Sequence, residues 1–308
     1  MRVRVLGAAA GGGFPQWNAG SDACRRARAG DPAARPATQA GLALSAAGEG
    51  WVLVNASPDL RQQIEATAEL HPRDGLRSSP IRAVVLTNGE VDAIAGLLSL
   101  REGTPFALYA HPRVLAVLDR NPVFEVLDGG LVPRRPLQPE VEVELADAAG
   151  APQGLLCRPF PVPGKLPLWL EGEARSLDTA ALDGDTLGLE LSDRGGRRLI
   201  WAANCAAVTR DLAERATGAD LLLMDGTLWR DDEMIRAGVG RKTGRRMGHV
   251  SMSGPAGAVA GLRGVPVGRR VFVHVNNTNP AHLADSPERA ELARAGWEVA
   301  HDGMDLSL

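Results

Sequence analysis

Short runs of apolar residues recur along the whole chain, and most have the length and composition of β-strands. They are rich in Val, Leu and Ile, and Gly, Pro, Asn or Asp residues separate them. This pattern is typical of strands that are buried in a sheet. The predicted strands cover residues 2–6, 41–45, 51–55, 83–86, 106–110, 187–191, 198–202, 221–225, 270–275 and 297–300.

Helix signals lie between several of these strands. Ser57-Pro58 and Ser286-Pro287 each place a capping hydroxyl ahead of a proline at the first helical position, which is a common way for a helix to begin. A further helix is predicted to start on Asp92, after a polar turn. One predicted helix contains Leu60 and Ile64. The others cover residues 92–100, 211–216, 255–262 and 288–295.

The order of these elements predicts the fold class. Strands come in pairs early and then alternate with helices, in both halves of the chain. This order indicates an α/β fold of two mixed sheets packed face to face, with helices outside, in a single domain spanning residues 1–308. Residues 133–139 are predicted to link the two halves. Residues 155–173, rich in Pro, Gly and Leu, are predicted to form a long ordered loop over one edge.

Composition limits the classes of function. The chain has 308 residues, 44% of them hydrophobic, and a formal net charge of −3 with both signs interspersed. Nothing here favours nucleic acid as a partner, and no apolar run is long enough to span a membrane. The three cysteines are odd in number and widely spaced, which fits a reducing cytoplasm better than a set of disulfides.

The segment 86–93 resembles the ligand loop of the metallo-β-lactamase superfamily, in which Thr-His-x-His-x-Asp-His holds two metal ions. Thr87 and Asp92 match this pattern, whereas Asn88, Glu90 and Ala93 stand where histidines are expected. Amide and methyl groups bind zinc or iron weakly or not at all. A two-metal hydrolase is therefore not expected.

Two later strands end in side chains that suit a metal site. Asp225 ends strand 221–225, where a carboxylate would bind a metal, bind a donor on a substrate or cap the next segment. His274 closes strand 270–275 and is either a site residue or a core histidine. If these strands are parallel and lie beside the strand that leads to Asp92, the three side chains meet at one rim. Asp92, Asp225 and His274 are the predicted metal ligands.

A basic segment follows Asp225 and suggests a way to bind an anionic substrate. Guanidinium groups suit carboxylates and phosphates, although charge runs are more often solvated surface. His249, at the end of the segment, would either orient Asp225 or begin a helix. The predicted substrate-binding residues are Arg241, Lys242, Arg245, Arg246, Asn276 and Asn277.

The Gly-rich tract 7–18 is not a dinucleotide-binding fingerprint, because its spacing is wrong and Phe14-Pro15 does not open a helix. We expect a tight bend that lines a pocket. This tract and four other stretches together resemble the family of coenzyme PQQ (pyrroloquinoline quinone) biosynthesis protein B. The stretches are GAAAGGGFPQWN at 7–18, NASPDLRQQI at 55–64, LTNGEVDAIAGLLSLREG at 86–103, MDGTLWRDDEMIRAGVGRKTGRRMGH at 224–249 and HVNNTNP at 274–280. The resemblance implies a metallo-β-lactamase-like αββα sandwich and a role in making PQQ from a peptide that contains glutamate and tyrosine.

The chain departs from the family in two places. The family usually follows Pro-Gln-Trp-Asn with Cys-x-Cys-x-x-Cys, a structural zinc knuckle, but this chain has Ala19, Ser21 and Cys24 there. We predict that the structural zinc is absent, because one thiolate cannot close a tetrahedral site. Ala93 replaces the histidine that normally follows Asp92, which leaves Glu90 as a substitute donor. Asn204, at the expected position of a metal-bridging carboxylate, lacks the charge to bridge two cations.

The resemblance leaves two classes of function open. In the first, one Fe(II) or Zn ion assists hydroxylation of the tyrosine ring of a processed Glu–Tyr precursor, with Asp92, Asp225 and His249 as catalytic residues. A facial set of donors with open positions suits non-haem Fe(II). In the second, the chain is a carrier that binds PQQ or its precursor for transport towards the periplasm without catalysis. The expected partners are this small molecule and other proteins of the PQQ pathway.

Overall fold

Two β-sheets account for most of the architecture of the computed structural model, which describes residues 1–165 and 184–308. The first sheet has six strands in sequence order. They are β1 (Arg2–Gly7), β2 (Gly41–Ser45), β3 (Trp51–Val54), β4 (Ile81–Val85), β5 (Ala107–Ala110) and β6 (Arg134–Pro136). The second sheet has seven strands. In spatial order they are β13 (Glu298–Val299), β12 (Arg269–Val273), β11 (Leu221–Asp225), β10 (Arg198–Ala202), β9 (Leu187–Asp193), β8 (Pro152–Pro161) and β7 (Val143–Ala146).

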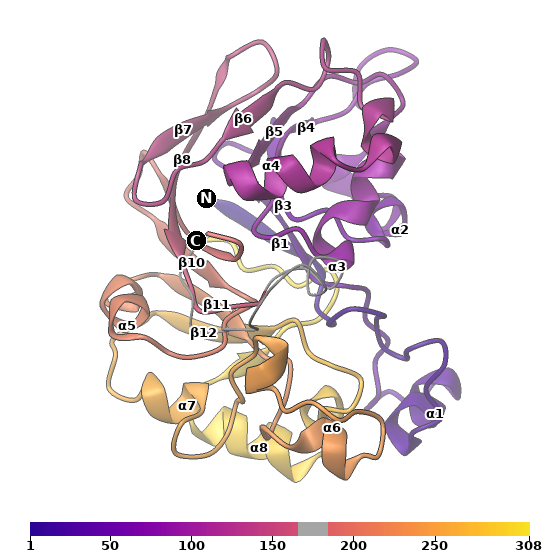
Figure 1. Cartoon of the computed structure of the whole chain (residues 1–308), viewed down its shortest axis with the longest axis vertical. Coiled ribbons are helices and arrows are strands. Elements are labelled where there is room, and N and C mark those ends of the chain that lie inside the picture. Colours follow the sequence, from indigo (N-terminus) through magenta and orange to yellow (C-terminus); the bar gives the residue numbers. More distant parts are fainter. Residues whose placement is uncertain (166–183) are drawn as a thin grey trace.

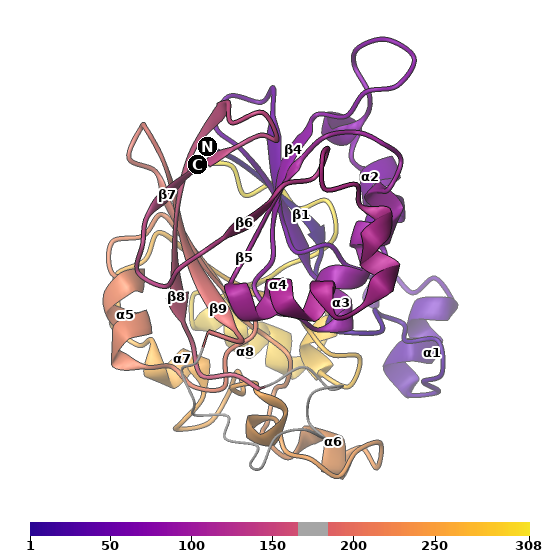
Figure 2. The same cartoon turned by 45° about the horizontal axis from the view of Figure 1, so that its top comes forward.

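Helices cover the outer faces of both sheets (Figure 1). The first sheet carries α2 (Leu60–Ala66), α3 (Val91–Ile94) and α4 (Pro112–Asp119), and the second carries α5 (Arg210–Ala216), α7 (Ala258–Gly261) and α8 (Pro287–Arg294). Two short helices, α1 (Asp22–Arg28) and α6 (Glu233–Arg236), lie at the lower end of the molecule in Figure 1. Viewed after a 45° turn, the sheets form the two inner layers of a sandwich (Figure 2). The predicted αββα arrangement is therefore confirmed.

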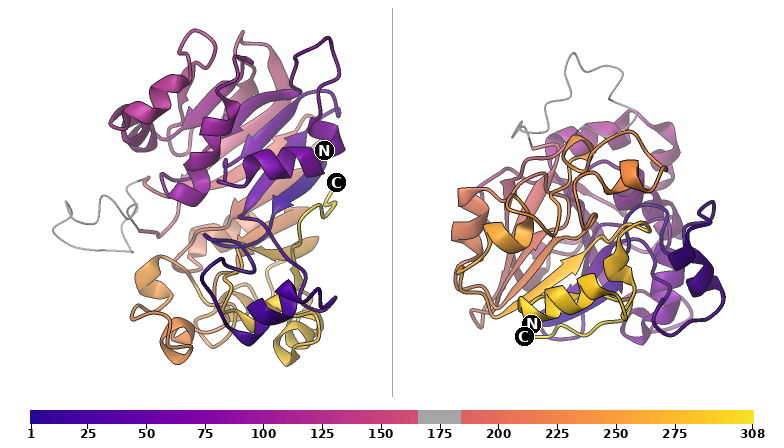
Figure 3. Two further views of the ribbon diagram at one scale, coloured as in Figure 1. Left: turned by 90° about the vertical axis from the view of Figure 1, so that its right-hand side faces the viewer. Right: turned by 90° about the horizontal axis from the view of Figure 1, so that it is seen from below.

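Three apolar layers hold the sandwich together. The central layer lies between the sheets, where Leu42, Val54 and Trp201 are fully buried. The outer layers lie between each sheet and its helices. Every residue of β3 and of β11 is buried, so both faces of these strands are covered. Burial on both faces explains why these strands are continuous apolar runs rather than alternating ones. The N-terminal amine and the Leu308 carbonyl are 3.3 Å apart, so the two chain ends lie side by side (Figure 3).

The sheets mix parallel and antiparallel pairs, and the parallel part sets the position of the site. In the first sheet β3, β4 and β5 are parallel neighbours, and in the second β10, β11, β12 and β13 are parallel neighbours. Within each set the carboxyl ends of the strands therefore reach the same edge of the sheet. Ligand sites in α/β folds form at such edges.

Several predicted boundaries were wrong. The predicted linker 133–139 contains β6, which pairs with β5. Residues 155–161 of the predicted loop belong to β8, which pairs with both β7 and β9, and residues 166–173 lie outside the described residues. Prolines and glycines obscured both strands in the sequence, since such residues usually mark loops. Helices α1 and α4 and strand β7 were also not predicted.

The helix starts were only partly predicted. Ser286 caps α8 as expected, accepting a hydrogen bond from the Arg289 N–H. Ser57 does not cap α2; its hydroxyl donates to Gln63 Oε1 instead. The helix predicted from Asp92 begins at Val91 as α3 and continues as a 3₁₀ helix, η2 (Ala95–Leu100). No helix in the described part of the chain is both long and apolar enough to cross a bilayer.

Candidate metal and substrate site

A cavity of about 460 Å³ lies at the carboxyl ends of the parallel strands, and residues from both sheets line it. The Gly-rich tract forms part of its wall through Gly11 and Gly12, as predicted. Gly12 has a φ of +91°, which glycine adopts without strain in such a tight bend. The ionisable residues on the wall are Glu90, Asp92, Lys165, Lys242, His249 and His274.

Two residues that follow strands hold a left-handed backbone conformation. Asn55, directly after β3, has a φ of +63°, and His274, directly after β12, has a φ of +61°. This conformation is unfavourable for histidine and persists only where surrounding contacts enforce it. Asn55 Oδ1 accepts hydrogen bonds from both the N–H and the hydroxyl of Thr87, at 2.9 and 3.1 Å. The turn after β3 therefore fixes the start of the loop that carries Asp92.

Asp92 and His274 meet across the gap between the two sheets. Asp92 Oδ2 lies 3.0 Å from His274 Nε2. Burial by itself would raise the pKa of Asp92, but the hydrogen bond and the charge of His274 outweigh it and the pKa lies below its usual value. Burial would likewise lower the pKa of His274, but Asp92 raises it above the usual value. Without a metal, the two groups therefore form a buried ion pair.

Thr227 connects the two histidines of the site. Its Oγ1 lies 2.8 Å from His274 Nδ1 and 3.1 Å from His249 Nδ1. Because Nε2 of His274 faces Asp92, the Nδ1–H of that ring donates to the threonine hydroxyl. This bond fixes the ring orientation, as the outer partners of metal-bound histidines do.

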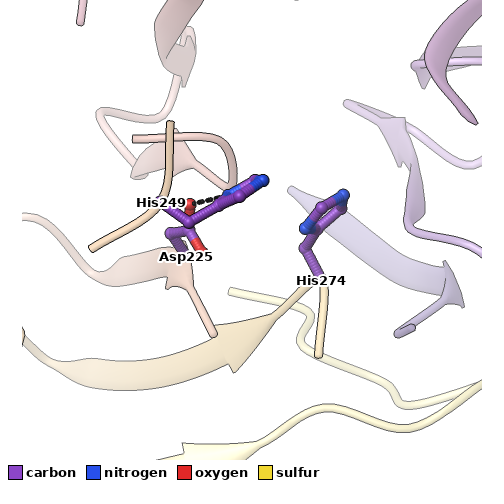
Figure 4. Close-up of side chains that lie close together, drawn as sticks. All are labelled: Asp225, His249 and His274. Atoms are coloured by element: carbon purple, nitrogen blue, oxygen red, sulfur yellow. Dashed lines mark hydrogen bonds and ion pairs between the residues drawn. The ribbon is translucent and has the colours of Figure 1, made fainter. Parts of the chain in front are cut away.

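Asp225 supports the second histidine (Figure 4). Its Oδ2 accepts hydrogen bonds from His249 Nδ1 at 2.7 Å and from the Cys205 N–H at 2.8 Å, and its Oδ1 accepts from the Thr227 N–H at 2.9 Å. With Nδ1 engaged on Asp225, the lone pair of a neutral His249 is on Nε2, which points away from Asp225 in Figure 4. Of the two alternatives for His249, the structure has the one in which it contacts Asp225.

Asp225, His249 and His274 form a group of three whose donor atoms lie within 4.8 Å of one another, a spacing compatible with a metal ion. Hydrogen bonds already occupy both oxygens of Asp225 and the Nδ1 atoms of both rings. Asp225 is therefore better suited to hold His249 than to bind a metal. The edge of this cluster that faces the cavity, where His274 Nε2 meets Asp92, fits a metal better.

The structure brings Asp92, Asp225, His249 and His274 together but arranges them differently from the expectation. The strand that leads to Asp92 was expected beside those of Asp225 and His274, but β4 lies in the opposite sheet. The strand beside β11 is instead β10, which leads to Asn204. Asn204 Nδ2 lies 3.4 Å from His274 Nε2. The site is therefore assembled across two sheets rather than along one edge.

The predicted substrate-binding residues divide into two groups. Lys242 and Asn276 line the cavity, whereas Arg241, Arg245 and Arg246 are exposed and do not. Asn277 donates to Gln16 Oε1 of the Gly-rich tract. The basic segment thus contributes one cation to the cavity wall and several to the surface beside it.

Three contributors to the site were missed in the sequence. Thr227 stands two residues after Asp225, a spacing that a search for strand-end polar residues would have found. Lys165 lies between a proline-rich stretch and residues outside the described part, and it carried no signal. Glu233 is buried, and its carboxylate accepts hydrogen bonds from the Trp229 N–H and the Thr278 hydroxyl. The Thr278 hydroxyl in turn accepts a hydrogen bond from Asn276 Nδ2. Burial raises the pKa of Glu233 to about 7.

The region expected to lack structural zinc has an apolar interior. Ser21 caps α1 by accepting from the Cys24 N–H, and Cys24 is fully buried beside Phe14 and Ala27. A single buried thiol in an apolar cluster does not provide a tetrahedral donor set. The absence of zinc here stays a prediction.

Comparisons with known proteins identify the class to which this site belongs. Residues 50–275 match the family model of the β-lactamase superfamily domain. The chain therefore has the metallo-β-lactamase fold, with the site at the edge where the two sheets meet.

Closer relatives narrow this class to one family. Coenzyme PQQ synthesis protein B from Gluconacetobacter diazotrophicus is 55% identical over 98% of both chains, and that from Rhodopseudomonas palustris is 54% identical over 100% of both. The crystal structure of Zn²⁺-bound PqqB from Methylobacterium extorquens matches with a TM-score of 0.95 and 52% identity, covering 100% of both chains. The chain belongs to the coenzyme PQQ synthesis protein B family, and its role is in PQQ synthesis.

Proposed function

We propose that this chain hydroxylates the tyrosine ring of a Glu–Tyr-derived PQQ precursor with the help of one bound metal ion. The observation that carries the proposal is the contact between Asp92 Oδ2 and His274 Nε2 at 3.0 Å on the wall of a 460 Å³ cavity. Two donors bound to one ion at roughly 2.1 Å and at right angles are about 3 Å apart. The pair therefore has the spacing of neighbouring metal ligands.

The donors limit which ions fit. Asp92 and His274 would hold the ion, and His249 is kept as a base. A carboxylate and an imidazole with open positions suit non-haem iron, although zinc takes the same donors. A relative with 52% identity binds Zn²⁺ in its crystal structure, which supports a metal here without choosing the element. When bound, Fe(II) would supply the activation of dioxygen.

The protein's own residues would position the ring and move a proton. Thr227 Oγ1 accepts from His274 Nδ1 and so keeps Nε2 of that ring directed at the ion. His249, held through Nδ1 by Asp225, presents Nε2 as an acceptor for the proton that leaves the ring or its phenol. In the balanced reaction, dioxygen provides one oxygen atom to the ring, and a two-electron reductant converts the other to water.

The cavity also has the charge to hold an acidic substrate. Lys165 and Lys242 lie on its wall, and Arg241, Arg245 and Arg246 are exposed nearby. Lysine and arginine bind carboxylates through charge-assisted hydrogen bonds. We propose that the three arginines attract the precursor and that Lys242 and Asn276 contact it inside. The three cysteines are free and buried, which is consistent with our expectation of a cytoplasmic protein.

Metal binding by itself tests the proposal. Isothermal titration of the metal-free protein with Fe(II) under argon, and with Zn²⁺, should show one site, and Asp92→Asn and His274→Gln should each remove it. Tyrosine hydroxylation is then measured with the iron-loaded protein, dioxygen and a reductant. A wild-type protein that binds neither metal would contradict the proposal.

The carrier function is the second candidate, and one observation favours it. Both oxygens of Asp225 are engaged in hydrogen bonds, and Ala93 offers no donor, so few ligands remain for an ion. A carrier would bind PQQ in the metal-free state, and Asp92→Asn would leave that affinity unchanged. Metal-dependent turnover by the wild type would rule it out as the main function.

A further inference from the structure

A second charged pair lies on the cavity wall beside the Asp92–His274 pair. Lys165 Nζ is 3.1 Å from Glu90 Oε1, and the two side chains are 19% and 15% exposed. Glu90, Lys165, Asp92 and His274 all line the same cavity of about 460 Å³. The two pairs can therefore face the same small ligand.

The main chain fixes Lys165 firmly in this position. Gly248 has a φ of +85°, and a Cβ there would stand 3.1 Å from both the backbone N and the Cγ of Lys165. A Cβ on Gly164 would stand only 2.5 Å from Thr186 Oγ1. On the other side, the Ala206 N–H donates to the Pro163 carbonyl at 2.7 Å. Two close approaches that need glycine thus bring the Lys165 backbone up to the cavity wall.

Glu90 is fixed in a similar way from the opposite sheet. Its N–H donates to Asn88 Oδ1 at 2.9 Å, and its carbonyl accepts from the Ala93 N–H at 2.9 Å. Glu90 is therefore held at the start of α3 while its carboxylate faces Lys165. Oε1 of Glu90 is already paired with the Lys165 ammonium, so Glu90 is a poor replacement for the histidine missing at position 93.

We propose that the Lys165–Glu90 pair recognises the α-amino acid group of the substrate, with Lys165 binding its carboxylate and Glu90 its ammonium. This inference rests on the proposed function and adds the chemical group by which the site selects its substrate. A zwitterion matches this pair because each of its charges meets the opposite charge on the wall. It also brings no net charge into the cavity, so the burial of charge is compensated within one group of four charges.

The pair also orients the substrate. With the α-amino acid group on Lys165 and Glu90, the side chain of a tyrosine would extend along the wall towards Asp92, His274 and His249. A simple ion pair that is open to solvent would contribute little to stability. Recognition of a ligand gives a reason for placing such a pair on a cavity wall.

The test compares three ligands that share one phenol ring. Calorimetry on the full-length, metal-free protein would use L-tyrosine, tyramine, which lacks the carboxylate, and 3-(4-hydroxyphenyl)propionate, which lacks the amine. We expect L-tyrosine to bind at least about tenfold more tightly than either analogue, because each lost charge removes a charge-assisted hydrogen bond.

Two single variants separate the two contacts. Glu90→Gln should weaken L-tyrosine about tenfold and leave 3-(4-hydroxyphenyl)propionate unchanged or tighter. Lys165→Met should weaken L-tyrosine to a similar degree and leave tyramine unchanged or tighter. Arg210→Met and Glu214→Gln, which disrupt an exposed pair with Nε and Oε1 2.6 Å apart, serve as matched controls and should change no affinity.

Equal binding of all three ligands to the wild type, or no binding of any of them, would overturn the inference. An equal loss of all three ligands in either variant would also overturn it, because that pattern indicates a structural lock rather than recognition. Binding is measured without metal or turnover. Discrimination without hydroxylation would therefore contradict only the proposed reaction, and hydroxylation without discrimination only the recognition.

Discussion

The loop after β4 and the loops after β11 and β12 face each other across one cavity, but they differ in what their polar residues do. In the first loop, Asn88 Oδ1 accepts from the Glu90 N–H, Glu90 contacts Lys165, and Ala93 is buried in an apolar cluster. Asp92 reaches across to His274, which follows β12. The residues at the three positions where the superfamily has histidines therefore have structural or electrostatic roles in this loop.

The second region keeps a complete network. Asp225, Thr227, His249 and His274 are connected by hydrogen bonds of 2.7 to 3.1 Å. The second region therefore orients its imidazoles through hydrogen bonds, whereas the first offers few further ligands for a metal. We therefore expect the site to hold at most one ion.

The largest effect is expected where the two regions meet. Asp92→Asn or His274→Gln should weaken Zn²⁺ binding by about 1000-fold, more than the 10–100-fold that follows loss of an outer partner. The reason is that each variant removes one of two well-placed donors. Competition with a zinc-sensitive dye measures the affinity, and Asn88→Ala serves as the control from the same loop. Equal weakening by all three variants would show that the loop matters through its shape alone.

Restoring a histidine in the first region should fail. Ala93 is 2% exposed, lies in the apolar cluster with Ala56 and Leu97, and does not line the cavity. Ala93→His should therefore lower the free energy of unfolding by about 3 kcal/mol, through overpacking and burial of a polar ring. Urea denaturation measures this, and elemental analysis should show no gain in bound metal. A stable variant that binds a second ion would contradict the asymmetry.

Substitutions of Thr227 test whether the orientation of the histidine rings in the second region affects metal binding. Thr227→Val removes the hydroxyl between the two Nδ1 atoms at nearly constant volume and should weaken metal binding about 10–100-fold. Thr227→Ser keeps the hydroxyl and should restore most of the affinity. Nitrogen chemical shifts of His274 should report mixed tautomers in the valine variant only. A valine variant with wild-type affinity would exclude this role.

The smallest effect concerns pH. Burial raises the pKa of Glu233 from 4.5 to about 7, so between these values the folded state holds a proton that the unfolded state has lost. Stability therefore falls as pH rises, by about 2 kcal/mol between pH 5 and 7. Glu233→Gln mimics the protonated acid and should flatten this dependence in urea titrations. Glu291→Gln, on the exposed side of α8, should leave the slope as it is.

Much of the fold could be predicted from the sequence, and the reason is local. Continuous apolar runs such as β3 and β11 are buried on both faces, and that burial is visible in composition alone. The strands β6, β7 and β8 could not be predicted in this way, because their Pro, Gly and polar residues interrupt the apolar pattern and are more typical of loops.

The candidate site likewise has features that the sequence predicts and features that it does not. The chain by itself determined which side chains stand at strand ends, among them Asp225 and His274, and which histidines are missing from the loop at 86–93. Only the tertiary structure decided that β4 lies in the opposite sheet and that Lys165 pairs with Glu90. It also decided that the Asp225 oxygens accept hydrogen bonds from Cys205, Thr227 and His249. The physical reason is that strand ends follow from local apolar patterns, whereas partners distant in sequence are chosen by how two sheets pack.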